Sequence, residues 1–296
     1  MSILAIIVSY NFVPWMGKCL GSLRQSDYPI DILVVDNHSQ DNTLAVLRDD
    51  YPDVKVIANS DNLGFGRANN IGMAYALEHH YDGVLLLNED AWVQRDTLTR
   101  LVKAAARYTH FGILSPIHLT GRGDELEKGF AHYIGVSDLK ALPKDTIVEA
   151  NFIDAAIWFM PTAAIQSVGM FAHIFKHYGE DKDLTNRLRH YGWKTGYLPQ
   201  AKGHHARENR VVTRQSRLYS VWVYLLSEYT NINYMLPVAF AKSVLAAVKK
   251  ALGGALHARF RDAGAYLRMA FTLMGRTPQV LVTRRESLHV NLKNYE

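Results

Sequence analysis

Short apolar runs alternate with amphipathic stretches through the first hundred residues. Four segments are dominated by apolar residues, as in strands buried on both faces of a sheet: residues 3–10, 31–37, 54–60 and 83–87. Four stretches have apolar side chains at helical spacing: residues 15–26, 39–47, 66–80 and 96–108. Because strand and helix alternate with short connections, the pattern predicts an α/β fold with a mostly parallel sheet flanked by helices.

The later residues follow a different pattern. Residues 109–150 are less regular, whereas residues 152–171 predict a strand, a turn at Pro161 and a short helix. Three acids within 180–183 are expected at the start of another helix, where the helix dipole favours negative charge. From residue 214 the chain is expected to be mostly helical.

Polar side chains lie at or directly after the end of each of the four predicted strands. They are Ser9 and Asn11, then Asp36, then Asn62, and finally Asn88, Glu89 and Asp90. One of them alone, such as Asp36, would fit a turn equally well. Because the carboxyl ends of parallel strands meet at one edge of a sheet, where ligands bind, the four sets together predict a ligand site rich in oxygen atoms.

Composition and charge limit the classes of binding partner and the cellular compartment that we expect. The formal net charge is +5, and the basic excess lies after residue 240, which suits a membrane surface, a nucleic acid or an anionic substrate. No nucleic-acid-binding signature occurs, so we expect no nucleic-acid partner. The single cysteine, Cys19, excludes a disulfide framework within the chain and suits a reducing compartment. With neither a signal-peptide pattern nor an apolar run of about 20 residues, a cytoplasmic location is expected.

Five sequence blocks occur in a specific order: IIVSYN (6–11), VVDNHSQDNT (34–43), NLGFGRANNIG (62–72), LLLNED (85–90) and GEDKDLTNRLRHYGWKTGYLP (179–199), followed by His205. In these blocks the chain resembles the family 2 glycosyltransferases of the GT-A fold, and among them the bacterial rhamnosyltransferase-like enzymes of surface polysaccharide synthesis. The resemblance covers about the first 205 residues. It implies a GT-A catalytic fold with a helical C-terminal extension.

The resemblance implies a nucleotide-sugar site at the strand ends. It places Ser9, Asn11 and Asp36 near the nucleoside. In the third block, glycine would let the backbone approach a ligand closely, and the N-terminus of the following helix would suit an anion. A tight turn explains the same glycines. The donor-binding residues expected from the third and fourth blocks are Asn62, Gly64, Arg67, Asn69 and Asn88.

The same resemblance implies a metal site. The LLLNED block stands where the family has a DxD motif, which holds the Mg²⁺ or Mn²⁺ ion that grips the diphosphate. Asn88 replaces the first acid, and Asp90 is the expected metal ligand because hard cations prefer oxygen ligands. The side chain of Glu89 is expected to face either the ribose or the solvent. His205 matches the family's metal-contacting histidine, with the adjacent His204 as its competitor.

Asp181 matches the catalytic base of the family. In an inverting transfer, a base takes the proton from the acceptor hydroxyl. Glu180 and Asp183 are expected to raise the pKa of Asp181, although Asp183 could cap the helix instead. Arg207 or Arg210 is expected to contact the diphosphate.

One departure affects the acceptor side of the site. The family often has a Gly-Ala pair where this chain has DAAIW, residues 154–158, so the shape of the acceptor pocket is left open. Trp158 is expected either to stack on an acceptor sugar or to be buried.

We therefore predict an inverting, metal-dependent glycosyltransferase. It would move L-rhamnose from dTDP-rhamnose, or a hexose from a UDP-sugar, to a hydroxyl of a surface polysaccharide or lipid-linked glycan precursor. The predicted catalytic domain is 1–213, with a nucleotide-sugar half (1–110) and an acceptor half (111–213). The helical region 214–296 would contact the catalytic domain, a second subunit of a homodimer, or the inner face of the cytoplasmic membrane as a peripheral protein.

Two other functions compete with this prediction. A nucleotidyltransferase would show a glycine-rich and basic signature directly after the first strand, where this chain has SYNFVPW. A nucleotide-sugar-binding module without transfer activity would have no need of Asp181, Asp90 and His205 together. Both features favour the glycosyltransferase.

Overall fold

The computed structural model describes residues 1–207 and 211–295, and within them the strands form one mixed sheet. Its strand order is β3-β2-β1-β4-β8-β6-β9-β5, with β7 paired to β9. The strands are β1 (Ile3–Ser9), β2 (Asp31–Asp36), β3 (Lys55–Ala58), β4 (Gly83–Leu87), β5 (Ala91–Val93), β6 (Phe111–Leu119), β7 (Val148–Glu149), β8 (Ile157–Pro161) and β9 (Lys194–His205).

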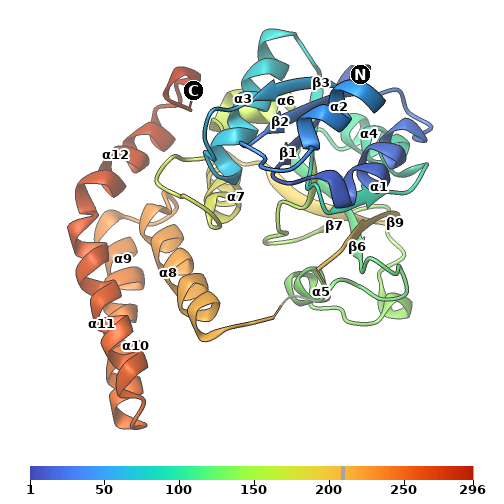
Figure 1. The fold of residues 1–296 in the computed structure, drawn as a ribbon. Coiled ribbons are helices and arrows are strands. Elements are labelled where there is room, and N and C mark those ends of the chain that lie inside the picture. Colours follow the sequence, from blue (N-terminus) through green and yellow to red (C-terminus); the bar gives the residue numbers. More distant parts are fainter. Residues whose placement is uncertain (208–210, 296) are drawn as a thin grey trace.

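Helices flank this sheet and form the C-terminal region (Figure 1). Those of the first two thirds are α1 (Val13–Arg24), α2 (Thr43–Asp50), α3 (Phe65–Glu78), α4 (Thr97–Arg107), α5 (Lys128–Ile134), α6 (Thr162–Val168) and α7 (Glu180–His190), with the 3₁₀ turn η1 (Leu139–Ala141). Those of the last third are α8 (Arg214–Thr230), α9 (Leu236–Phe240), the π-helical η2 (Ala241–Leu245), α10 (Ala246–Leu256), α11 (Phe260–Gly275), α12 (Thr277–Leu288) and η3 (Leu292–Tyr295).

The first half of the sheet is parallel, which confirms the prediction. β1 pairs in parallel with β2 and β4, and β2 pairs in parallel with β3. Because successive side chains of a strand point to opposite faces, β1 places Ala5 and Ile7 in one buried cluster and Leu4 and Ile6 in another. Helices α1, α2 and α4 pack on the first cluster, and α3, α6 and α7 pack on the second.

The second half contains antiparallel pairs that the strand–helix alternation does not predict. β8 is antiparallel to β4 and β6, and β5 is antiparallel to β9. The short strand β5 starts directly after Asp90, and its first residue, Ala91, pairs with His205 at the end of β9. This pairing brings the acids that follow β4 next to a histidine from a distant part of the chain.

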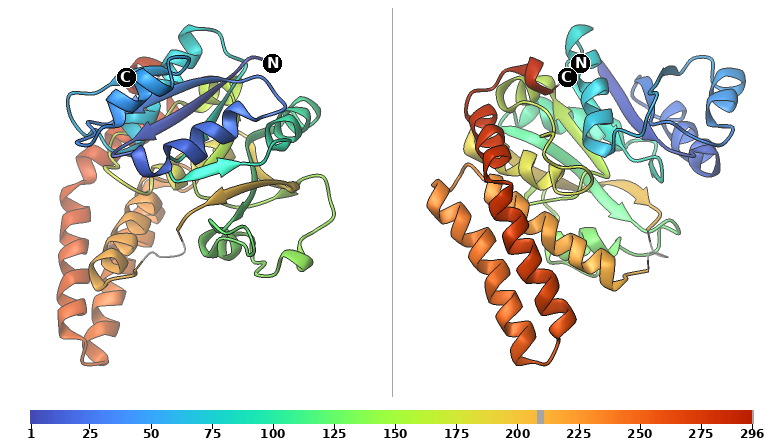
Figure 2. Two further views of the ribbon diagram at one scale, coloured as in Figure 1. Left: turned by 45° about the vertical axis from the view of Figure 1, so that its right-hand side comes forward. Right: turned by 60° about the vertical axis from the view of Figure 1, so that its left-hand side comes forward.

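The C-terminal helices extend away from the sheet and then return to it. Helices α10 and α11 form a hairpin that projects beyond the rest of the molecule (Figures 1 and 2). Beyond α12, the carbonyl oxygen of Tyr295 accepts a hydrogen bond from Nδ2 of Asn70 in α3, at 3.0 Å. Within the described residues, no helix combines the length and apolar character needed to cross a bilayer.

Candidate active site

Asp36 anchors a hydrogen-bond network at the ends of β1 and β2. Its side chain is buried, and its carboxylate accepts hydrogen bonds from the Ser9 hydroxyl at 2.9 Å and from the Ser39 backbone N–H at 3.0 Å. The Asn11 N–H donates to the Ser39 hydroxyl at 2.9 Å, and Asn11 Oδ1 accepts from the backbone of Gln40 at 2.8 Å. The structure therefore gathers Ser9, Asn11 and Asp36 in one network. Their contact with a nucleoside stays a prediction.

The predicted diphosphate block forms a tight turn before α3. Asn62 Oδ1 accepts hydrogen bonds from Nδ2 of Asn37 at 2.9 Å and from the Gly64 N–H at 3.0 Å. Gly64 has a φ of +83°, and a Cβ atom there would collide with the carbonyl oxygen of Lys176. Gly64 thus allows a close approach of the Lys176 backbone. This agrees with the alternative that the glycine serves a tight turn.

Two further residues of this block have different surroundings. Asn69 is buried, and its Nδ2 atom donates to the Phe65 carbonyl one turn earlier in α3, at 3.0 Å. Arg67 is exposed on the same helix. Among the residues predicted from this block, Arg67 is therefore the cation that solvent can reach, whereas the Asn69 amide is already engaged in the helix.

The acids that follow β4 have separate environments. Glu89 Oε2 accepts a hydrogen bond from the Tyr10 N–H at 2.8 Å, which ties the end of β4 to the end of β1. Burial raises the pKa of Glu89 to about 7, and the charge of Asp90 acts in the same direction. The Asn88 side-chain nitrogen lies 3.5 Å from His205 Nε2, while its Oδ1 atom is buried without a hydrogen-bond partner.

His205, rather than His204, faces Asp90. The Nε2 atom of His205 lies 3.4 Å from Asp90 Oδ1, and the ring is completely buried. Burial acts to raise the pKa of Asp90, but the neighbouring His205 and Arg207 outweigh it and the pKa is lowered. His204 points to the opposite side of β9, where it donates to the Thr120 carbonyl and stacks on Trp92.

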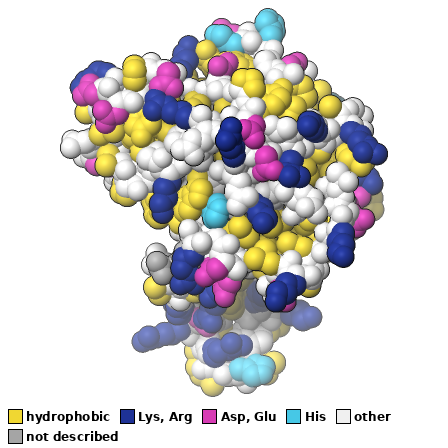
Figure 3. All heavy atoms as spheres, turned by 90° about the vertical axis from the view of Figure 1, so that its right-hand side faces the viewer, with side chains coloured by type: hydrophobic (Ala, Val, Ile, Leu, Met, Phe, Trp, Pro, Cys, Tyr) yellow, Lys and Arg dark blue, Asp and Glu magenta, His cyan; other side chains and the backbone are white. Residues whose placement is uncertain are grey.

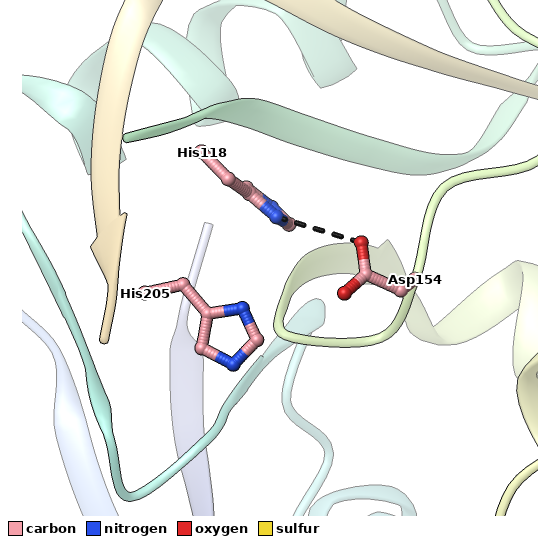
Figure 4. A group of neighbouring side chains, drawn as sticks. All are labelled: His118, Asp154 and His205. Carbon is pink, nitrogen blue, oxygen red and sulfur yellow. Dashed lines mark ion pairs between the residues drawn. The ribbon is translucent and has the colours of Figure 1, made fainter. Parts of the chain in front are cut away.

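His118 and Asp154, which the sequence analysis does not select as site residues, lie beside His205 (Figure 4). The Nδ1 atom of His118 is 3.6 Å from Asp154 Oδ1, and one ligand atom from each of the three side chains lies within 4.8 Å of the others. Burial lowers the pKa of His118 to about 3 and raises that of Asp154. Nothing in their spacing signals this cluster, since it joins β6, the loop before β8, and β9.

Asp181 lies at the start of α7, as predicted. Its Oδ1 atom accepts the Lys182 N–H at 2.8 Å. Burial raises the pKa of Asp181 to about 6, and the charge of Asp154 adds to the shift. Burial raises the pKa of the neighbouring Glu180 further, to about 8. Near neutral pH, Asp181 is therefore the ionised member of this acidic pair.

Asp183 has a structural role that differs from the two alternatives predicted for it. Its carboxylate accepts hydrogen bonds from Arg187 Nε at 2.8 Å and from the Thr230 hydroxyl at 2.9 Å, so it links α7 to α8. Arg207 Nη2 contacts the Tyr178 hydroxyl at 3.4 Å, and its charge helps to lower the pKa of Asp90. Arg210 lies outside the described residues.

Comparison with known proteins identifies the chain. Residues 4–134 match the family model described as glycosyl transferase family 2. These residues therefore resemble a family 2 glycosyltransferase domain. The chain is 25% identical over 225 residues to the N-acetylglucosaminyl-diphospho-decaprenol L-rhamnosyltransferase of Mycobacterium tuberculosis, covering 67% of this chain and 73% of the relative. It is 33% identical over 107 residues to the undecaprenyl-phosphate mannosyltransferase of Micrococcus luteus, covering 35% and 44%.

Solved structures show that the glycosyltransferase has a GT-A fold. The structure of S. aureus TarS 1–349 in complex with UDP-GlcNAc superposes with a TM-score of 0.60 at 15% identity, covering 100% of this chain and 89% of that one. Mannosyltransferase PcManGT from Pyrobaculum calidifontis, in complex with GDP-Man and Mn²⁺, gives a TM-score of 0.60 at 18% identity, covering 97% and 86%. The predicted fold class is thereby confirmed.

Two features of this glycosyltransferase bear on its acceptor side. Trp158 is completely buried in β8, so the buried alternative applies and the ring is not available to stack on a sugar. A cleft of about 690 Å³ lies along residues 124–140, around α5 and η1, and none of the predicted donor-site residues lines it.

Proposed function

We propose that the protein is an inverting, metal-dependent glycosyltransferase that uses a nucleotide-sugar donor. The observation that carries this proposal is the contact between Asp90, which follows β4, and His205, which ends β9: their Oδ1 and Nε2 atoms lie 3.4 Å apart. Asp154 lies beside His205, and its charge contributes to the raised pKa of Asp181 at the start of α7. We therefore assign the proposed base and the proposed metal ligands to one site.

Asp90 and His205 are the residues that we propose to hold the metal. The pair offers one carboxylate oxygen and one imidazole nitrogen 3.4 Å apart, and such donors suit Mn²⁺ or Mg²⁺. Asn88 Oδ1, which is buried and has no hydrogen-bond partner among the described residues, would be a third ligand atom beside them. When bound, the ion would act as a Lewis acid that stabilises the departing nucleoside diphosphate. Because Glu89 accepts a hydrogen bond from the Tyr10 N–H, we propose that it connects the ends of β1 and β4 and does not bind the metal.

Asp181 is the proposed base. A carboxylate with a pKa of about 6 is ionised at neutral pH yet is a stronger base than an ordinary aspartate. It would accept the proton of the acceptor hydroxyl as the oxygen attacks the anomeric carbon. Glu180, whose pKa is about 8, is mostly protonated at neutral pH and does not compete for that proton. Ser9, Asn11 and Asp36 would contact the nucleoside, with Arg67 near the diphosphate.

The relatives support a donor and an acceptor class. One relative transfers L-rhamnose to a diphospho-decaprenol-linked sugar, and structural neighbours were solved with UDP-GlcNAc and GDP-Man. We propose that this chain moves L-rhamnose from dTDP-rhamnose, or a hexose from a UDP-sugar, to a lipid-linked glycan precursor. Its catalytic domain would be residues 1–213, with the helices of 214–296 as a separate region.

The α10–α11 hairpin supports a lipid-linked acceptor. At its tip Leu256 is 86% exposed and Phe260 is 70% exposed. Figure 3 shows Lys and Arg side chains gathered around this end, at the bottom of the view. The basic residues of 242–276 are Lys242, Lys249, Lys250, Arg259, Arg261, Arg268 and Arg276, and the one acid in this range, Asp262, is paired with Arg214 and Arg217. Apolar side chains within a basic surface favour contact with an anionic membrane interface.

A donor screen tests the proposed function. The purified protein is incubated with Mn²⁺, a polyprenyl-diphosphate-linked GlcNAc acceptor and a panel of dTDP-, UDP- and GDP-sugars, and nucleoside diphosphate release is measured. We expect release from one donor class that depends on acceptor and metal. Binding of donors without turnover of any of them would instead support a nucleotide-sugar-binding module. Release of pyrophosphate would support a nucleotidyltransferase.

A further inference from the structure

His205 has Asp90 beside its Nε2 atom, and Asp154 lies within 4.8 Å on the side of its other ring nitrogen (Figure 4). Its Nε2 atom is 3.4 Å from Asp90 Oδ1. Its Nδ1 atom is buried and has no hydrogen-bond partner among the described residues, and it is directed towards the side where His118 and Asp154 lie (Figure 4). A neutral imidazole carries a single N–H, so the group that accepts this hydrogen decides which nitrogen keeps the lone pair that a metal needs.

The contacts of His118 favour a tautomer that carries its hydrogen on Nε2, away from Asp154. The Ser115 hydroxyl has one hydrogen and donates it to the Pro116 carbonyl at 2.9 Å. The same hydroxyl lies 2.9 Å from His118 Nε2, so it accepts the hydrogen on that nitrogen. Because the ring is completely buried, it is neutral, and its Nδ1 atom then presents a lone pair to Asp154 at 3.6 Å.

The carboxylate of Asp154 consequently needs a donor from another residue. Its Oδ1 atom is buried and unpartnered, and so is the Nδ1 atom of His205. The ligand atoms of the His118, Asp154 and His205 cluster lie within 4.8 Å of one another. With His118 Nε2–H committed to Ser115, the Nδ1–H of His205 is the ring hydrogen of this cluster that Asp154 can accept.

We propose that Asp154 is a positioning residue that accepts the Nδ1–H of His205 and so directs the Nε2 lone pair of that ring towards the metal position at Asp90. This inference rests on the proposed function, because the lone pair matters only if a metal is bound there. A carboxylate behind a metal-binding histidine fixes the ring's tautomer and orientation and makes the ligand nitrogen more basic. Asp154 thus acts through His205 and does not touch the donor.

The tautomer of His205 tests this assignment without a transfer reaction. Histidine-selective ¹⁵N NMR spectra are recorded with Mg²⁺ at about pH 8, where an ordinary histidine is neutral, and the His205→Gln variant identifies the signal. We expect the Nδ1–H form in the wild type, the same form in Asp154→Asn, which keeps an acceptor oxygen, and a loss of this preference in Asp154→Ala. An Nε2–H ring in the wild type would overturn the proposal.

Metal affinity gives a second and independent readout. Free Mn²⁺ is followed by electron paramagnetic resonance, and the Asp49→Ala variant, which removes an exposed acid from α2, is the matched control. We expect Asp154→Ala to weaken Mn²⁺ binding about 10- to 100-fold, with partial recovery in Asp154→Asn and no change in the control. Unchanged affinity in Asp154→Ala would overturn the proposal. So would a co-purifying metal ion that His118→Ala removes, since the cluster itself would then be the binding site.

The outcomes separate this inference from the proposed function. If the donor screen shows no turnover but the wild-type ring carries its hydrogen on Nδ1, the proposed function fails and the Asp154–His205 hydrogen bond stands. If transfer occurs and the ring carries its hydrogen on Nε2, the proposed function stands and the positioning role of Asp154 fails.

Discussion

The Nε2 atom of His205 lies 3.4 Å from Asp90 Oδ1 because the backbone of Ala91 pairs with His205 across β5 and β9. A strand of three residues, Ala91–Val93, thus connects an acidic loop to the far end of a long strand. The metal pair that we propose depends on this register, because a shift by one residue would turn His205 to the other face and bring His204 towards Asp90.

Asp90 and Glu89 are adjacent acids that should differ in their effect on metal binding. We expect Asp90→Asn to weaken Mn²⁺ binding at least about tenfold, because it removes a charged ligand, and Glu89→Gln to change it less than about threefold, because Glu89 is tied to the Tyr10 backbone. Isothermal titration with Mn²⁺ measures both. Equal losses in the two variants would contradict the assignment of Asp90 as the ligand.

The pKa of Asp181 predicts how transfer depends on pH. A base must be ionised to accept a proton, and the pKa of this carboxyl is raised to about 6. The rate should therefore be low well below pH 6, rise as pH increases through about 6, and level off above that value. A kcat profile between about pH 4.5 and 8 at saturating donor measures this. If the rate instead falls as pH rises over that range, Asp181 is not the base of the reaction.

The buried pair of Asp183 and Arg187 should contribute to stability. Both side chains are nearly inaccessible, and Arg187 also donates to the Val168 and Met170 carbonyls. Asp183→Ala leaves a buried guanidinium without its partner, so we expect the free energy of unfolding to fall by about 3–5 kcal/mol. Urea unfolding monitored by circular dichroism measures this change.

A matched control exists for that prediction. Asp96, directly before α4, and Arg100, within α4, form an ion pair with the same i,i+4 spacing as Asp183 and Arg187. Both side chains of this control pair are 44% exposed. Asp96→Ala should lower the free energy of unfolding by no more than about 1 kcal/mol. If the two aspartate variants lose the same stability, burial does not account for the role of Asp183.

The hairpin tip should control binding to membranes. In co-sedimentation with vesicles that contain anionic phosphatidylglycerol, we expect the double variant Leu256→Ser, Phe260→Ser to bind at least about tenfold more weakly than the wild type, because two exposed apolar side chains are lost. The control is Val211→Ser, Val212→Ser, which changes an equally exposed apolar pair before α8. A wild type that stays in the supernatant, or an equal loss in the control, would refute the membrane contact.

The sequence predicts the parallel half of the fold because that half follows a regular local pattern. Strands 3–9, 31–36, 55–58 and 83–87 lie within the apolar runs, and α1 to α4 follow them. The antiparallel strands were less predictable, since β5 has three residues and β6 contains Pro116 within a segment that showed no clear period. The helix predicted over 39–47 begins later, at Thr43, with Asn42 as its N-cap residue, while Ser39 bonds Asp36 and Asp41 bonds Thr43.

The sequence points to candidate site residues only where they stand in a sequence block. Ser9, Asp36, Asp90 and Asp181 all lie at element ends that the apolar pattern marks. Asn62 and Asn69 lie in such a block too, yet their side chains bond within the turn and within α3, which depends on geometry that spacing does not reveal. The cluster of His118 and Asp154 with His205 arises from the pairing of distant strands, and no local signal marks it.

Sugar transfer by the wild type and by Asp181→Asn, each assayed with and without Mn²⁺, tests the central claim most directly. The donor identified by the screen is used with the lipid-linked acceptor, and glycosylated product is quantified. We expect metal-dependent transfer by the wild type and a kcat lower by about 10²- to 10⁴-fold in Asp181→Asn, with donor affinity unchanged, because only the base is lost. Undiminished transfer by Asp181→Asn, or full transfer by the wild type after chelation of all divalent ions, would contradict the account.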